Sequence, residues 1–205
     1  MAQMGAVNSG QPHFSALEDG AYGLLRKLPP GLCVDCGAAA GVTVGRILKH
    51  SPNSRVIAFE PFPGNWPRFE EAWGGDSRCE LRKIALGTGA TIAPFYVAHS
   101  ATLGGHAGAS NVGTLVGRGD LEPTLMVPVS TLDREIEEPI RFLKMDVQGA
   151  ELDVLRGGQQ TLAKGVDVLF VEYGGERDLL DLLLERFVVF DHRYLLMPFV
   201  DGVSM

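Results

Sequence analysis

The 205-residue sequence has no block of basic residues, no long apolar run and only three cysteines. Its net charge is −7, which argues against a nucleic-acid partner, because a phosphate backbone calls for clustered Lys and Arg. No apolar run approaches the length needed to span a bilayer, and segment 1–13 lacks the charged start and apolar centre of a signal peptide. Three cysteines do not form a disulfide framework in so long a chain, so we expect a cytoplasmic protein.

Two of the cysteines, Cys33 and Cys36, form a Cys-x-x-Cys pair, a pattern found in redox and zinc sites. Residues three apart in a strand point to opposite faces, and Cys79 has no second cysteine beside it. We therefore favour a structural role for these thiols. No other spacing of His, Cys and carboxylates predicts a metal site.

Short runs rich in Val and Ile alternate with helix-like stretches, a pattern typical of βαβ units and a parallel sheet. We expect an N-terminal extension over 1–20 and one domain over 21–205. The predicted strands are 32–35, 55–60, 80–86, 92–98, 125–129, 141–147 and 166–173. The predicted helices are 42–50, 66–73, 130–136, with Ser130 as its cap, 150–164 and 176–186.

Three further features concern the later part of the chain. Segment 166–173 is nearly all apolar, which predicts a buried central strand. Segments 187–190 and 194–200 are separated by three residues, so they are predicted to pair as an antiparallel hairpin. The stretch 99–122 holds six glycines and little periodicity, which predicts a functional lid or a locally disordered loop.

The segment 33–41 has the composition of a cofactor loop between a strand and a helix. Its small residues allow close approach of a ligand to the backbone. Asp35 stands where a dinucleotide-binding loop has its first glycine, and a carboxylate there would repel a pyrophosphate but attract an ammonium. Glu60 ends the next strand, where a carboxylate can accept hydrogen bonds from both hydroxyls of a ribose. These charges favour S-adenosylmethionine over NAD.

The segment 141–151 has the same design, because a buried strand delivers Asp146 to the rim of the sheet and Gly149 turns the chain into a helix. A placed carboxylate typically adds about 10²–10⁴-fold to a reaction as general base. We predict that Asp146 is this base or a hydrogen-bond acceptor, and that Lys144 and Glu151 shape the pocket. The alternatives are that Asp146 caps the helix or holds the cofactor, that Glu151 only favours the helix dipole, and that Lys144 pairs with Glu151 or Glu172.

Five motifs, at 34–38, 58–61, 85–87, 127–133 and 144–151, resemble the successive motifs of FkbM-type methyltransferases. The resemblance spans about 31–173, and the Lys-x-Asp-x-Gln-Gly-x-Glu element is its most specific part. It implies the α/β class I methyltransferase fold. This is a Rossmann-like sandwich whose seven-stranded, mostly parallel sheet ends in an antiparallel C-terminal hairpin, with helices on both faces. Members of this family use S-adenosylmethionine, and those characterised mostly methylate hydroxyls on polyketides, sugars or lipids.

We therefore expect an S-adenosylmethionine-dependent O-methyltransferase that acts on a hydroxyl of a small molecule, sugar or lipid-like acceptor. The predicted catalytic residues are Lys144, Asp146 and Glu151. The predicted cofactor-binding residues are Asp35, Gly37, Ala38, Gly41, Glu60, Pro61, Ala85, Leu86 and Asp146. The acceptor is expected at the 99–122 stretch and the N-terminal segment.

Two other classes of protein stay open. A nicotinamide-dependent oxidoreductase is disfavoured by Asp35 and by the lack of a Tyr-x-x-x-Lys pair. A non-catalytic protein that retains the cofactor-binding fold is indicated only by Ala39, where the family usually has Asn. That substitution removes a polar group near the methionine end of the cofactor.

Overall fold

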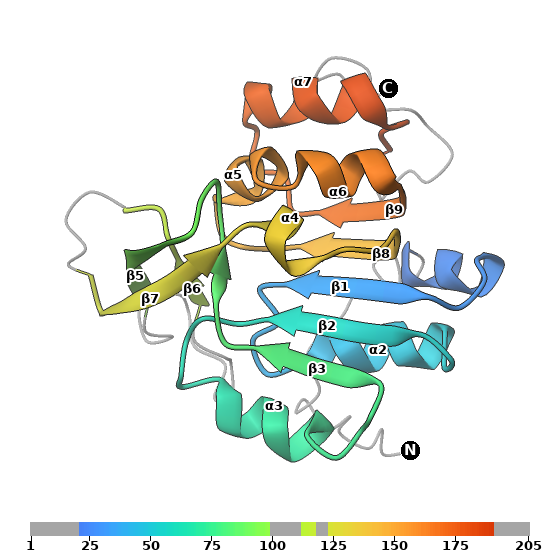
Figure 1. The fold of residues 1–205 in the computed structure, drawn as a ribbon, viewed down its shortest axis with the longest axis horizontal. Helices are drawn as coiled ribbons and strands as arrows, with labels where there is room; N and C mark the ends of the chain where they lie inside the picture. Colours follow the sequence, from blue (N-terminus) through green and yellow to red (C-terminus); the bar gives the residue numbers. More distant parts are fainter. Residues whose placement is uncertain (1–20, 99–111, 118–122, 191–205) are drawn as a thin grey trace, which may run out of the picture.

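The computed structural model of the protein describes residues 21–98, 112–117 and 123–190. At its centre lies a five-stranded parallel sheet of order β3-β2-β1-β8-β9 (Figure 1). Its strands are β1 (Leu32–Cys36), β2 (Arg55–Phe59), β3 (Cys79–Arg82), β8 (Ile140–Met145) and β9 (Val166–Val171). The chain places β2 and β3 on one side of β1 and then returns to place β8 on the other side. The carboxyl ends of β1 and β8 therefore form a topological switch point, where open α/β sheets bind ligands.

Helices cover both faces of this sheet, as predicted (Figure 1). The short 3-10 helix η1 (Leu24–Lys27), α2 (Val42–His50) and α3 (Trp66–Trp73) pack on one face. On the other face pack α4 (Leu132–Glu135), α5 (Glu151–Arg156), α6 (Gln159–Lys164) and α7 (Arg177–Arg186).

The two cysteines of the Cys-x-x-Cys pair lie in different apolar cores, on opposite faces of the sheet, as expected for residues three apart in a strand. Cys33 packs on the α2 side and Cys36 on the α7 side, and neither is in a disulfide. Burial raises the pKa of the Cys33 thiol to about 11 and also raises the pKa of Cys36. Both thiols therefore stay protonated at neutral pH, which suits packing rather than redox chemistry.

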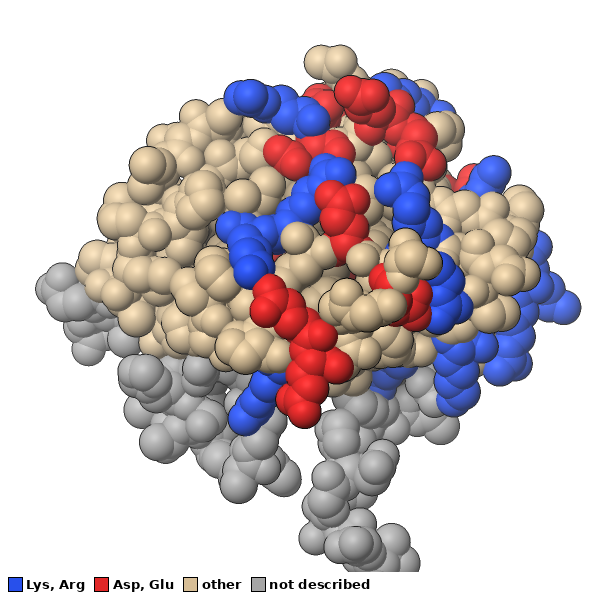
Figure 2. Space-filling view, turned by 60° about the horizontal axis from the view of Figure 1, so that its bottom comes forward, with Lys and Arg blue, Asp and Glu red and all other residues tan. Residues whose placement is uncertain are grey.

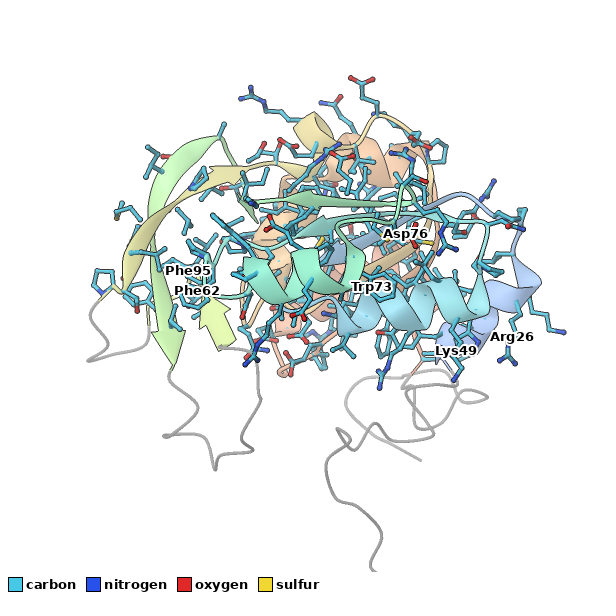
Figure 3. All side chains as sticks on the ribbon, turned by 90° about the horizontal axis from the view of Figure 1, so that it is seen from below. Arg26, Lys49, Phe62, Trp73, Asp76 and Phe95 are labelled. Carbon is cyan, nitrogen blue, oxygen red and sulfur yellow. The ribbon has the colours of Figure 1, made fainter. Side chains whose placement is uncertain are left out.

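A second sheet is inserted between β3 and β8. It has four strands in the order β4-β7-β5-β6, namely β4 (Ala85–Leu86), β5 (Thr91–Ala98), β6 (Val112–Thr114) and β7 (Leu125–Ser130). Strand β5 pairs antiparallel with both β6 and β7. The buried face of the sheet forms a third apolar cluster, and Figure 3 shows two of its members, Phe62 and Phe95, next to each other.

This second sheet corrects two predictions. The expected strand 80–86 is two strands, because β4 leaves the parallel sheet and pairs with β7. The parallel sheet has five strands among the described residues, and the seven-stranded sheet stays a prediction because the strand 194–200 lies outside them. Within the stretch expected to be a loop, β6 is a strand, while 99–111 and 118–122 lie outside the described residues.

The expected helix 150–164 is also two helices, which are separated by Gly157 and Gly158. A Cβ at Gly157 would lie 2.0 Å from the carbonyl oxygen of Gly87, so close approach of the chains requires glycine there. Glycine in turn disfavours a continuous helix. The cap of α4 is Thr131 rather than Ser130, since the Thr131 hydroxyl accepts a hydrogen bond from the backbone N–H of Arg134.

Strand β9 differs from the buried central strand that was predicted at 166–173. Strand β9 lies at the edge of the sheet as described, and most of its residues are only partly buried. Segment 187–190 contains no strand beyond a single bridge at Phe190. The predicted partner strand 194–200 and the predicted extension 1–20 lie outside the described residues.

Acidic and basic side chains lie side by side across the face drawn in Figure 2. Ion pairs such as the partly exposed Arg78–Asp76 and the exposed Lys83–Glu70 bring opposite charges together at the surface. In the part of the chain that the structure describes, no helix is long and apolar enough to cross a membrane.

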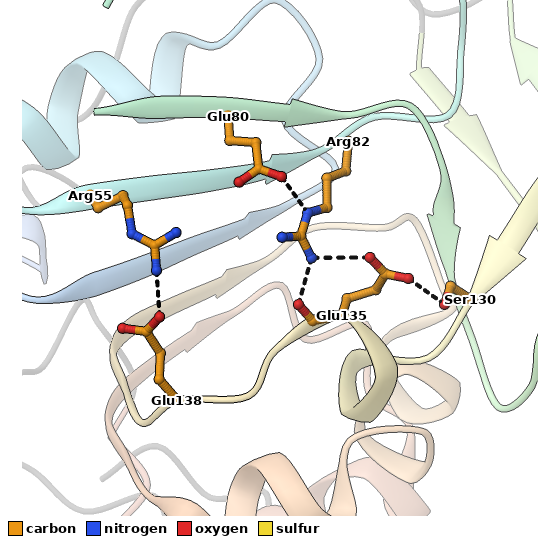
Figure 4. Close-up of polar contacts among 6 residues, drawn as sticks. All are labelled: Arg55, Glu80, Arg82, Ser130, Glu135 and Glu138. Carbon is orange, nitrogen blue, oxygen red and sulfur yellow. Dashed lines mark hydrogen bonds and ion pairs between the residues drawn. The ribbon is translucent and has the colours of Figure 1, made fainter. Parts of the chain in front are cut away.

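A polar network around Arg82 joins the two sheets (Figure 4). Its guanidinium donates to Glu80 on β3 and to the carboxylate of Glu135 on α4, at 2.8 and 3.0 Å. The other Glu135 oxygen contacts the hydroxyl of Ser130, at the end of β7, at 2.6 Å. One guanidinium therefore links the edge of the parallel sheet to the inserted sheet through α4.

Replacing Arg82 with Met is expected to lower the free energy of unfolding by about 1–3 kcal/mol, because it leaves the half-buried Glu135 without its charged partner. The matched control is Arg55→Met, which breaks the ion pair with Glu138, also drawn in Figure 4. Both members of that pair are about half exposed, so its loss should change stability by less than about 1 kcal/mol. Urea unfolding of the two variants measures the difference, and equal effects would contradict a bridging role for Arg82.

Candidate functional site

A pocket opens at the carboxyl ends of β1, β2 and β8, at the switch point of the sheet. It encloses about 720 Å³ outside the protein atoms, open solvent at its mouth included. The strand ends and the loops after them form one wall, and β4, β5 and the β6 region of the second sheet form the other. The lining residues are Cys36, Gly37, Ala39, Phe59, Glu60, Pro61, Ile84, Ala85, Leu86, Phe95, Gly113, Leu115, Asp146, Val147, Gln148 and Ala150.

The loop after β1 is held against both neighbouring strands. The backbone N–H groups of Gly37 and Ala38 donate to the carbonyl of Phe59 on β2, both at 3.0 Å. Gly37 has φ 79°, and a Cβ there would lie 2.0 Å from the carbonyl oxygen of Asp146, so only glycine fits. Ala39 is also left-handed, with φ 49°, a conformation that Asn tolerates better than Ala.

Glu60 is fixed by two backbone N–H groups at the edge of this loop. Its Oε2 accepts from Ala39 and its Oε1 from Phe62, both at 2.8 Å. Burial raises the pKa of the Glu60 carboxyl, although these hydrogen bonds oppose the rise. Each carboxylate oxygen has a second lone pair, so Glu60 can also accept hydrogen bonds from a ligand in the pocket.

Lys144 lies between two carboxylates on adjacent strands. Its Nζ is 3.3 Å from Oδ1 of Asp35 and 3.5 Å from Oδ2 of Asp146, and it donates to the carbonyl of Gly37 at 3.2 Å. Burial alone would lower the pKa of Lys144, but attraction to Asp35 and Asp146 outweighs it and the pKa is raised. Lys144 is therefore a buried, permanently charged ammonium beneath the pocket.

Asp35 is fully buried and does not line the pocket. Neither of its oxygens has a well-formed hydrogen bond among the described residues, and its charged neighbour is Lys144. Burial raises the pKa of Asp35, while Lys144 opposes the rise. Contact of Asp35 with a ligand ammonium stays a prediction, and in this structure the ammonium next to Asp35 is that of Lys144.

Glu151 is a buried carboxylate that organises the loop after β8. Its two oxygens accept hydrogen bonds from the backbone N–H groups of Val147 and Gly149, both at 2.9 Å. Glu151 does not line the pocket and does not pair with Lys144. Its geometry therefore suits a positioning role rather than contact with a reacting group.

Asp146 reaches the pocket and has polar neighbours on its solvent side. The side-chain amide of Gln148 donates to Oδ1 of Asp146 at 2.6 Å and to Oε2 of Glu172, the residue after β9, at 2.9 Å. Burial works to raise the pKa of Asp146, but Lys144 and the hydrogen bonds from Glu172 and Gln148 outweigh it, and the pKa is lowered. Asp146 is therefore ionised at neutral pH.

The structure thus divides the predicted residues into two groups. Those in the pocket wall are Gly37, Glu60, Pro61, Ala85, Leu86 and Asp146. Those behind the wall are Asp35, Ala38, Gly41, Lys144 and Glu151. Gly41 has φ 80° and its carbonyl accepts from the indole N–H of Trp73 at 2.8 Å, which ties α2 to α3.

Gln148, Glu172 and Phe95 were not predicted from sequence as part of the site, whereas Ala85 and Leu86 of β4 were. Gln148 lies inside the specific motif and Glu172 ends an apolar strand, so both had a signal of the kind that identified Asp146. Gly113 and Leu115 lie in the 99–122 stretch, which was expected to contact the acceptor, but the lack of periodicity there singles out no residue. Thr114 in that stretch donates to the carbonyl of Gln148 at 2.8 Å, which joins the second sheet to the loop after β8.

A parallel sheet with carboxylates at its strand ends, around a pocket at the switch point, defines an α/β protein built to bind a ligand there. Residues 35–194 match the family described as methyltransferase FkbM domain, and the chain belongs to that family. A curated protein, "2-O-methyltransferase NoeI" of Sinorhizobium fredii, is 28% identical over 183 residues, covering 78% of this chain and 73% of that protein. The solved structure of "Methyltransferase FkbM from Methylobacillus flagellatus KT" aligns with TM-score 0.48 at 19% identity, over 70% of this chain and 34% of that one. The chain thus spans about a third of that solved protein.

Proposed function

We propose that the protein is an S-adenosylmethionine-dependent methyltransferase that methylates a hydroxyl of a small-molecule, sugar or lipid-like acceptor. The observation that carries the proposal is the charge pattern of the pocket, in which Glu60 and Asp146 stand at the ends of two strands with β1 between them. Membership in the FkbM family supports methyl transfer, and similarity to a protein named a 2-O-methyltransferase supports a hydroxyl acceptor.

The lining residues fit the parts of this cofactor. The Glu60 carboxylate accepts hydrogen bonds from the ribose hydroxyls, with its orientation fixed by Ala39 and Phe62. The apolar surface of Leu86, Phe95 and Leu115 suits the adenine. The positively charged methionine end then lies toward Asp146, the ionised carboxylate of the wall.

When bound, S-adenosylmethionine would supply an electrophilic methyl group on its sulfonium. The chain contributes alignment, which can supply roughly 7–11 kcal/mol in favourable cases. Asp146 orients the acceptor hydroxyl as a hydrogen-bond acceptor. Lys144 holds that carboxylate in place from beneath, and Asp35 balances the charge of Lys144.

Binding of S-adenosylhomocysteine, with NAD as the comparison ligand, tests this proposal. At 100 times its Kd, a ligand adds about 2.7 kcal/mol to stability. For a chain of this size the melting temperature should then rise by roughly 5–11 °C. Glu60→Gln puts an amide donor against a backbone N–H and should weaken binding at least tenfold, whereas Glu70→Gln, at an exposed position, should not. A rise in melting temperature with NAD alone, or no rise with either ligand, would refute the proposed cofactor.

A further inference from the structure

Asp146, in the pocket wall, and Glu172, which lies outside the pocket lining, form a carboxyl pair joined by Gln148. They follow adjacent parallel strands, and the backbone N–H of Glu172 donates to the carbonyl of Met145 at 2.9 Å, which aligns the two strand ends. A single nitrogen, Nε2 of Gln148, lies 2.6 Å from one carboxyl group and 2.9 Å from the other. Two carboxyl groups that share one hydrogen-bond donor repel each other when both are ionised, which favours a proton on one of them.

The surrounding charges decide which group holds this proton. Lys144 faces Asp146 at 3.5 Å and favours its ionised form. Glu172 keeps much of its surface exposed, yet desolvation by its neighbours, the hydrogen bond to Asp146 and the charges of Asp146 and Glu151 raise its pKa to about 7, and Lys144 opposes the rise. The proton therefore resides on Glu172, and near neutral pH a modest change in the local charge can remove it.

We propose that the Asp146–Gln148–Glu172 cluster recognises the positive charge on the sulfur of the cofactor, and that Glu172 releases its proton to solvent when S-adenosylmethionine binds. The inference rests on the proposed function, which brings the methionine end of the cofactor to Asp146. Release of the proton changes the pair from one negative charge to two, opposite the sulfonium. S-adenosylhomocysteine has the same ammonium and ribose but a neutral sulfur, so it leaves Glu172 protonated.

This linkage prepares Glu172 for the methyl-transfer step. With the charged cofactor bound, the Glu172 carboxylate is free to take the proton of the acceptor hydroxyl. The oxygen–carbon bond forms as the carbon–sulfur bond breaks, the electron pair stays on sulfur, and the hydroxyl proton moves to Glu172. The sulfur is then neutral, so the protonated pair is again the favoured state and the cycle closes without a further reactant.

Isothermal titration calorimetry tests the proposal without an acceptor. Binding of S-adenosylmethionine and of S-adenosylhomocysteine at pH 7 is measured in buffers of different ionisation enthalpy, which counts the protons released. With a Glu172 pKa of about 7, S-adenosylmethionine should release about half a proton more than S-adenosylhomocysteine. The affinity for S-adenosylmethionine relative to S-adenosylhomocysteine should also rise about tenfold from pH 6 to pH 8, because only the ionised pair is competent.

Glu172→Gln should bind S-adenosylhomocysteine as wild type does but S-adenosylmethionine no more tightly than wild type does at pH 6. It should also abolish the difference in proton release and its pH dependence. Asp146→Asn gives a second test, because Glu172 without its partner is already ionised at pH 7 and has no proton to release. The control, Glu185→Gln on the exposed face of α7, should behave as wild type. Equal proton release with both ligands, or a difference that survives in Glu172→Gln, overturns the proposal while the proposed function stands. Failure of both ligands to bind wild type overturns both.

Discussion

Replacing Lys144 with Met is expected to lower the free energy of unfolding by about 3–5 kcal/mol. The substitution removes the positive counter-charge of Asp35, whose side chain has no exposed surface. It also leaves Asp35 and Asp146, two carboxylates that Lys144 now separates, without a counter-charge. Breaking a buried pair costs more than the pair contributes, because the remaining charge stays in a medium of low polarity.

The loss should depend on pH in a definite direction. Burial already raises the pKa of Asp35, and Lys144 opposes that rise. Without Lys144 the folded-state pKa rises further above the unfolded value, so the folded variant binds the proton more tightly than the unfolded chain does. In the variant, the Asp35 carboxyl therefore contributes favourably to the free energy of unfolding at low pH. This contribution is lost as the pH increases through the pKa of Asp35 in the folded state. The deficit relative to wild type should be smaller at pH 5 than at pH 8 in urea unfolding.

Two comparisons separate this effect from a general loss of packing. Lys83→Met removes an exposed ion pair with Glu70 and should cost less than about 1 kcal/mol. The double variant Asp35→Asn, Lys144→Met removes both buried charges and should recover much of the lost stability. A double variant as unstable as the sum of the two single variants would show that the two charges do not interact.

The parallel sheet and the carboxylates at its strand ends could be predicted from sequence because both leave local signals. Glu60 and Asp146 each end an apolar run, and each lies in the pocket wall as that pattern predicts. The partner of Lys144 could not be predicted in this way. Asp35 and Lys144 are opposite each other in the register of β1 and β8, and register between strands far apart in sequence follows from packing rather than from local pattern.

The pairing within the second sheet escaped prediction for a related reason. Strand β4 has two residues and β6 has three, which is too short for an alternating pattern to stand out. Strands β5 and β7 were predicted, at 92–98 and 125–129, although each contains a proline. Their pairing with each other, and not any local signal, places Phe95 and the β6 region against the pocket.

Replacing Gly37, in the loop after β1, with Ala is expected to disrupt the proposed cofactor site. An added Cβ would lie 2.0 Å from the carbonyl oxygen of Asp146, which is backbone and cannot rotate away. The positive φ of 79° adds about 1–2 kcal/mol of strain for alanine. Either the loop after β1 must move, which displaces Ala39, or the end of β8 must move, which displaces Asp146.

The expected result is a loss of S-adenosylhomocysteine affinity of about 100-fold or more, because a displacement of about 1 Å at a positioned group can cost that much. The matched control is Gly75→Ala, where no atom lies within 4 Å of the added Cβ and φ is ordinary, so binding and stability should be unchanged. Calorimetry measures affinity, and circular dichroism shows whether the variant keeps its fold. A folded Gly37→Ala protein with wild-type affinity would place the cofactor away from this loop. Loss of affinity in a folded variant would instead tie cofactor binding to the close contact between Gly37 and the carbonyl group of Asp146.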